Sequence, residues 1–141
     1  MSADRLQSHL GSLRALLVAA LQRLGDPADT ESLHEMRVVL RRLRMLLRPL
    51  ARSGQAGLLR DVAAGVFRQT NSLRDDEVLL EELVRNGMHA AAAARQAQQV
   101  RDRQALMDSP GLGGLMAAWP VDGVACLSGP SRRQRRGLKQ K

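Results

Sequence analysis

Aromatic residues are scarce in this chain of 141 residues, which contains one Phe, one Trp and no Tyr. A hydrophobic core must therefore be aliphatic, and hydrophobic residues, mostly Leu and Ala, make up 44% of the chain, which is enough to form one. The single Cys excludes an intramolecular disulfide, and the three His residues lack the paired spacing of a structural zinc site. This length and composition indicate one compact domain, with no metal site or cofactor expected.

Long apolar runs are also absent. Arg14 and Arg23 bracket an apolar run that covers only residues 15 to 21. A helix that crosses a bilayer needs about 20 apolar residues, so no membrane span is expected. Nothing in the sequence suggests secretion, and we therefore expect a cytoplasmic protein.

The alternating pattern typical of strands does not occur, and apolar residues instead recur at steps of three and four. This spacing predicts helices over residues 3 to 24, 55 to 70 and 88 to 107, and a short helix that ends at Trp119. Asn71 and Ser72 are expected to form a turn before a further helix over residues 73 to 85, whose acidic first turn would lie at its positive end. Such short connections specify an all-α antiparallel helical bundle with four long helices and one or two short ones.

Another predicted helix extends to about residue 52, and the sequence offers two ways to begin it. Asp29 or Thr30 can act as its N-cap, or Ser32 and Glu35 can form a capping box. Pro49 is expected to end or kink its last turn, because proline cannot continue the helical hydrogen bonds.

Acidic residues are in short supply, with 14 Asp and Glu against 22 Lys and Arg, which gives a net charge of +8. A polyanionic partner is therefore the leading expectation, and 20 of the 22 cations are Arg, whose guanidinium binds phosphate bidentately. The excess is local: residues 34 to 68 carry +6, residues 69 to 85 carry −3, and residues 132 to 141 carry +6. We expect a helical domain over residues 1 to 120 and a disordered basic tail over residues 121 to 141.

The residues of the second helix fall on two faces when they are placed at 100° per residue. Eight apolar side chains fall within one arc of about 140°, namely Leu33, Met36, Val39, Leu40, Leu43, Leu46, Leu47 and Leu50. Another arc, about 80° wide and about 27 Å long, holds His34 followed by five arginines, Arg37, Arg41, Arg44, Arg48 and Arg52. We call these five residues the arginine row. We expect Arg37, Arg41, Arg44 and Arg48 to be exposed on one face, with Met36, Leu40, Leu43 and Leu47 buried.

The arginine row has two interpretations. Most charge runs on helices are solvated faces. Neighbouring members of this row are three or four residues apart, however, and their repulsion costs about 1 to 2 kcal/mol in total. Glu35 is the main acid beside them, whereas a solubilising face would interleave acids. A linear phosphate polymer is the natural complement of such a row, and His34 is equally consistent with a ligand contact and a structural role.

Two sequence elements resemble the CHAD family, the conserved histidine α-helical domain. The first is His34, Arg37 and the sequence Arg41-Arg42-Leu43-Arg44, and the second is Arg74-Asp75-Asp76-Glu77-Val78. Glu77 stands where the family has its second Asp. The resemblance covers about Leu6 to Trp119.

The resemblance implies an all-helical domain that binds inorganic polyphosphate and has no catalytic activity, which would also place it with polyphosphate granules. It implies that the ligand-binding residues are His34, Arg37, Arg41, Arg42, Arg44, Arg48, Arg52 and Arg74, with Asp75, Asp76 and Glu77 as structural acidic partners. We expect Arg74 or Asp75 to lie close to the second helix. Family members are typically bilobal, and this chain is similar to the N-terminal half alone. Three alternatives follow: a weak single-walled binder, a homodimer that rebuilds the channel, or a truncated relic.

Other functions are weighed on the same residues. An enzyme would need a nucleophile, an acid and base pair or a metal cluster, and none is visible in the sequence. Nucleic-acid binding is the serious alternative, because duplex phosphates would accept the arginine row and the tail by counterion release. The scarcity of aromatic residues predicts that such binding would be weak, sensitive to salt and independent of base sequence.

Overall fold

The computed structural model describes residues 3–50 and 54–119. The predicted basic tail and Arg52 lie outside the described residues. The described chain is all-α, as predicted, and no strand occurs in it. Its elements are α1 (Ala3–Leu24), α2 (Thr30–Leu47), a short 3-10 helix η1 (Arg48–Leu50), α3 (Gly54–Arg85), α4 (His89–Met107) and α5 (Pro110–Ala118).

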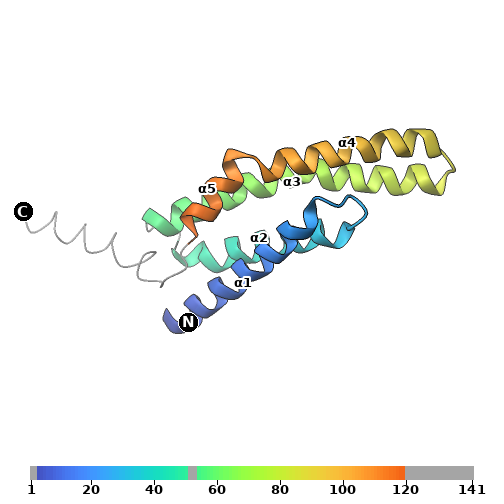
Figure 1. Cartoon of the computed structure of the whole chain (residues 1–141). Coiled ribbons are helices and arrows are strands. Elements are labelled where there is room, and N and C mark those ends of the chain that lie inside the picture. Colours follow the sequence, from blue (N-terminus) through green and yellow to red (C-terminus); the bar gives the residue numbers. More distant parts are fainter. Residues whose placement is uncertain (1–2, 51–53, 120–141) are drawn as a thin grey trace, which may run out of the picture.

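Two antiparallel helical hairpins make up the bundle (Figure 1). The first is formed by α1 and α2, and the second by α3 and α4, whose far end projects beyond the first hairpin (Figure 1). The hairpins meet where α2 packs against α3, and α5 folds back onto α3. This order makes α2 and α3 neighbours along most of α2, so the arginine row lies beside a second helix.

The core is aliphatic because α1, α2 and α3 each contribute a stripe of small or branched apolar side chains, to which α4 adds Leu106 and α5 adds Leu112 and Leu115. In α2 the side chains of Met36, Leu40, Leu43 and Leu47 are 0% exposed, which confirms the predicted apolar face. Trp119 is buried at the end of α5, where its Nε1 donates a 3.2 Å hydrogen bond to the carbonyl oxygen of Leu10 in α1. That bond fixes α5 against the opposite hairpin.

The turn predicted at Asn71 and Ser72 is wrong, because both residues lie within the continuous helix α3. Thr70 and Leu73 continue the buried stripe through this point, and the Thr70 hydroxyl donates to the carbonyl oxygen of Phe67 one turn earlier. Asn and Ser lower helix stability only modestly, and burial of the stripe outweighs that cost. The acids at 75–77 therefore lie in the middle of a helix, and their interpretation as charge at a helix start is also wrong.

The first turn of α2 is capped by Asp29, whose carboxylate accepts a 2.9 Å hydrogen bond from the backbone N–H of Ser32. The alternative capping box does not form, because Glu35 instead accepts a 2.8 Å hydrogen bond from Arg23 in α1. The α-helix ends at Leu47, earlier than predicted, and Pro49 lies in the 3-10 turn that follows. The prediction that Pro49 ends or kinks the last turn of this helix is thus confirmed.

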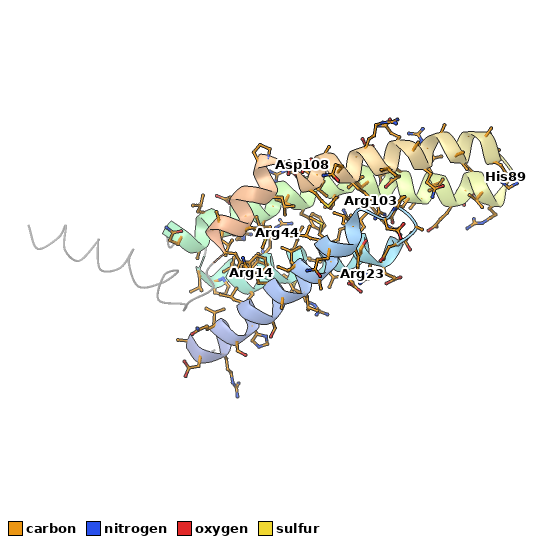
Figure 2. The ribbon with its side chains drawn as sticks, viewed as in Figure 1. Arg14, Arg23, Arg44, His89, Arg103 and Asp108 are labelled. Atoms are coloured by element: carbon orange, nitrogen blue, oxygen red, sulfur yellow. The ribbon has the colours of Figure 1, made fainter. Side chains whose placement is uncertain are left out.

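A buried arginine joins the two hairpins. Arg103 of α4 is 0% exposed, and its Nη2 donates a 2.7 Å hydrogen bond to the Glu77 carboxylate of α3. Its Nη1 lies 3.1 to 3.2 Å from the carbonyl oxygens of Leu24, Asp26 and Asp29, in the connection between α1 and α2. Figure 2 shows Arg103 at this junction. The arginine holds the angle between the hairpins, and so it fixes where α2 lies on α3.

Candidate functional site

The members of the arginine row that the structure describes are Arg37, Arg41, Arg44 and Arg48, and they face a groove between α2 and α3. Two turns of α3 supply the opposite side of this groove with Arg60 and Phe67. We define the α2–α3 groove by six residues, Arg37, Arg41, Arg44, Arg48, Arg60 and Phe67.

Members of the arginine row differ in exposure. Arg41 and Arg48 are exposed, whereas Arg37 and Arg44 are half-buried and lie down towards α3. Figure 2 shows Arg44 between the two hairpins. The prediction that all four project into solvent therefore holds for two of them, because α3 covers the other two.

Phe67 lies under three of the guanidinium groups. The Cζ atom of Arg37 is 4.5 Å from the centre of the ring, and those of Arg41 and Arg44 are both 5.7 Å from it. A cation within about 6 Å of an aromatic face is attracted by the negative face of the ring. One ring thus gathers three positive charges from one side of α2.

Arg37 is also anchored by hydrogen bonds to α3. Its Nη1 donates to Thr70 Oγ1 at 2.7 Å and to Asn71 Oδ1 at 2.9 Å. Burial lowers the pKa of Arg37, and the positive charges of Arg41 and Arg74 lower that pKa further, against the opposing effect of Asp75. Arg74 and Asp75 thus lie near enough to Arg37 for their charges to affect its pKa. The lowering effect of Arg41 and Arg74 reflects the positive potential around Arg37.

The other end of the groove is an open pocket of about 260 Å³. Its lining residues are Arg41, Arg44, Met45 and Arg48 of the α2 segment and Arg60 of α3. The Nε atoms of Arg44 and Arg60 are buried and have no hydrogen-bond acceptor among the described residues. Buried donors without acceptors are costly, and Arg14 Nε in α1 is a third such atom among the described residues.

Carboxylates do not neutralise the α2–α3 groove. Within residues 3–50 and 54–119, none of its five arginines forms an ion pair with Asp or Glu. Glu77 instead pairs with Arg103 at 2.7 Å and with Arg74 at 3.3 Å, and Asp76 pairs with Arg95 of α4 at 3.6 Å. Asp76 and Glu77 therefore pair away from the arginine row, while Asp75 is exposed.

Three of the predicted site residues, Arg42, His34 and Arg74, lie outside this groove, and Arg74 pairs with Glu77. Arg42 is exposed and lines a separate hollow of about 310 Å³ between α1 and α2, together with His9 and Ser12. His34 is exposed at the beginning of α2. The structure thus brings together Arg37, Arg41, Arg44 and Arg48, and it separates Arg42 from them.

Sequence reasoning missed Arg60 and Phe67, although a signal for both exists. In an antiparallel hairpin, the numbers of facing residues add up to a constant. The contact of Arg37 with Asn71 sets that sum at 108, which places Phe67 opposite Arg41 and Arg60 opposite Arg48. The sum of residue numbers can be used in this way only after α2 and α3 have been recognised as an antiparallel hairpin.

The described residues were also inspected for other kinds of site. No group of three or more His, Cys, Asp or Glu side chains among them could hold a metal ion. None of the helices in the described ranges is both long and apolar enough to cross a membrane.

Comparisons with known proteins agree with the helical architecture. No curated protein and no solved structure matches the chain. The family model of the CHAD domain matches residues 4–121, which include both hairpins, α5 and every described residue of the α2–α3 groove. The chain therefore belongs to the CHAD domain family.

Proposed function

We propose that this protein binds inorganic polyphosphate in the α2–α3 groove and does not catalyse a reaction on it. CHAD domains are associated with polyphosphate, and the groove has the chemistry that a phosphate polymer requires. Five arginines line the groove, and none of them forms an ion pair with a carboxylate in the part of the chain that the structure describes. Their guanidinium groups offer paired N–H donors that match phosphate oxygens.

One observation carries the proposal furthest: the buried Nε atoms of Arg44 and Arg60 lack acceptors within the described chain. They come from different helices and line one pocket. Arg44 and Arg60 are half-buried, and a buried N–H donor without an acceptor is unfavourable. An anionic oxygen would supply the missing acceptor and offset part of the repulsion between the two guanidinium groups. Binding of phosphate oxygens would explain why Arg44 and Arg60 lie at one pocket and why that pocket is positively charged.

The length of the groove favours a polymer over a single phosphate. Arg37 and Arg48 are eleven residues apart on one helical segment, which corresponds to about 16 Å along the axis. Arginines recur on the same side at every turn between them. A chain of linked phosphates can contact several of these guanidiniums at once, whereas one phosphate reaches only its immediate neighbours.

A single copy of the chain provides two sides to this groove. The arginine row on α2 faces Arg60 and Phe67 on α3, so a second subunit is not required to enclose a ligand from both sides. This arrangement supports binding by one chain, and a homodimer remains an alternative that the same experiment addresses through the stoichiometry.

The test is a titration with polyphosphate and with duplex DNA of equal charge, at about 50 mM and about 200 mM salt. The wild-type chain is compared with the double substitution Arg41→Ala and Arg48→Ala and with a chain that lacks residues 131 to 141. Arg85→Ala with Arg101→Ala is the matched control, because both arginines are exposed, lie outside the groove and remove the same charge.

We expect the groove double substitution to weaken polyphosphate binding at least about tenfold, and the matched control to change it little. Equal losses from both pairs would mean that net charge alone determines binding. Loss of binding on tail deletion, with little effect of the groove substitutions, would assign the activity to the tail. Equal affinities for DNA and polyphosphate would favour a nonspecific basic domain.

A further inference from the structure

The position of Phe67 is unusual for the only Phe of the chain. Its side chain is half-buried and packs against the core, yet one face of the ring lies under the guanidiniums of Arg37, Arg41 and Arg44. Leu21, Leu46 and Leu50 are also partly buried at the edge of the core, so partial exposure alone does not distinguish Phe67. Its ring differs by its contact with three guanidinium groups, and it forms the floor of the α2–α3 groove.

The negative face of the Phe67 ring offsets part of the repulsion between the guanidinium groups of the arginine row. Three guanidiniums within about 6 Å of one point repel one another, and elsewhere in this protein arginines are held by carboxylates, as in the pairs Arg23–Asp29 and Arg103–Glu77. A carboxylate in the groove would hold the arginines equally well. It would also occupy the N–H donors that a phosphate needs and repel the phosphate.

An aromatic floor avoids that competition. A guanidinium is planar, and its five N–H donors point outward in that plane, so contact between its face and a ring leaves the donors available. Arg37 is closest to the ring and is further held by Thr70 and Asn71. Arg41 and Arg44 lie farther from the ring centre and line the open pocket.

We propose that Phe67 is a positioning residue for anion binding. Its ring holds Arg37, Arg41 and Arg44 in place, while the donors of Arg41 and Arg44 stay free for phosphate oxygens. The inference rests on the proposed binding of polyphosphate in the same groove. It adds that the affinity depends on the aromatic face of a residue that carries no charge.

The test compares Phe67→Leu with Phe67→Trp. Leu keeps an apolar side chain on the core but removes the ring, whereas Trp restores an aromatic face that binds cations more strongly. Val62→Ala is the matched control, because Val62 is a half-buried residue of α3 that packs on the core near Gly114 of α5, away from the groove. Each variant is titrated with polyphosphate at several salt concentrations, and its melting temperature is measured.

We expect Phe67→Leu to bind polyphosphate about tenfold more weakly than the wild type. The dependence of its affinity on salt should keep the wild-type slope, since every arginine is still present. Phe67→Trp should bind at least as tightly as the wild type, and Val62→Ala should lower the melting temperature without a loss of affinity. If Phe67→Leu does not melt cooperatively, Phe67→Met replaces it, because the unbranched Met side chain fills irregular space.

Two results would overturn the inference: wild-type affinity in Phe67→Leu, or equally weak binding in Phe67→Leu and Phe67→Trp. The first would mean that the ring does not position the arginines, and the second that only the shape of Phe67 matters. In both cases the proposed function stands if Arg41→Ala with Arg48→Ala still weakens binding. Failure of the wild type to bind polyphosphate would instead refute the proposed function itself.

Discussion

Arg103 and Glu77 form an ion pair in the interior of the bundle, with 2.7 Å between Nη2 and Oε1 and side-chain exposures of 0% and 4%. Burial raises the pKa of Glu77 and lowers that of Arg103, so desolvation works against both charges. The carbonyl oxygens that Arg103 also contacts offset part of this cost. The pair therefore fixes the geometry of the hairpins, and its two members depend on each other.

We expect Arg103→Ala to lower the free energy of unfolding by about 3 to 5 kcal/mol, because it leaves the Glu77 carboxylate buried beside only Arg74. The combined substitution Arg103→Ala and Glu77→Gln should be less damaging than the sum of the two single substitutions. Urea denaturation of the four chains measures this coupling. Arg101→Ala on the exposed side of α4 is the control, and additive losses in the double variant would contradict the expected dependence.

Self-repulsion in the α2–α3 groove predicts a conflict between stability and binding. Arg41→Glu replaces two repulsive contacts, with Arg37 and Arg44, by attractive ones at spacings of four and three residues. We expect it to raise the free energy of unfolding by about 1 kcal/mol at low salt and to weaken polyphosphate binding. Thermal melts at low and high salt provide the measurement, and the gain should shrink as salt screens the charges.

Arg101→Glu makes the same charge change on α4 and serves as its control. Position 101 lies outside the groove and has no arginine three or four residues away, so no gain in stability is expected from this substitution. A similar gain from both substitutions would show that lowering the net charge, and not the arrangement of the groove, accounts for the effect.

The continuity of α3 predicts opposite effects of two substitutions at Ser72. Ser72→Pro should destabilise the fold by about 3 kcal/mol or more, because proline removes a hydrogen bond inside a helix and clashes with the preceding turn. Ser72→Ala should stabilise it by about 0.5 kcal/mol, since Ala has the higher helix propensity. Chemical denaturation measures both, and a neutral Ser72→Pro would restore the turn that the sequence suggested.

The cap of α2 predicts a dependence on pH. The hydrogen bonds from Arg23, 2.8 and 3.0 Å long, hold the pKa of Asp29 below its ordinary value of 3.8. A lowered pKa in the folded state stabilises the fold above the ordinary value, and this contribution is lost as the pH falls through the folded pKa. Asp29→Asn keeps a capping side chain but removes the charge.

We therefore expect Asp29→Asn to be less stable than the wild type at about pH 6, and we expect the difference to shrink as the pH falls below 3.8. Urea midpoints at a series of pH values give the comparison. A difference that persists unchanged at the acidic end would show that the carboxylate acts through its shape alone.

Apolar spacing predicted most of the helices correctly because burial of Leu side chains dominates their stability. The same reasoning failed at Asn71 and Ser72, where the weak helix propensity of two polar residues was given more weight than the buried stripe through Leu73. Arg103 could not be identified from the sequence, since nothing in its neighbourhood distinguishes a buried cation from an exposed one. Its role depends on carbonyl groups that only the folded α1–α2 connection brings together.

The candidate site was predictable to the extent that it lies on one helix. Positions 37, 41, 44 and 48 share a face of α2 by periodicity alone. The separation of Arg42 from them, the depth of Arg44 and the contribution of Arg60 follow from the packing of α3, which periodicity within α2 does not contain. Phe67 was overlooked for the same reason, because a single aromatic residue in an apolar stripe is usually a core residue.

All six residues of the α2–α3 groove lie between positions 37 and 67 of the chain, and the side chains that anchor Arg37 extend this stretch only to Asn71. Both sides of the groove are thus inherited together, as one uninterrupted piece of coding sequence. A duplication of that piece copies every residue of the groove. An insertion in the connection between α2 and α3 keeps the identity of these residues and changes only how far apart the two sets lie along the chain. Evolution can multiply this site, or retune it, without assembling it anew from distant parts of the gene.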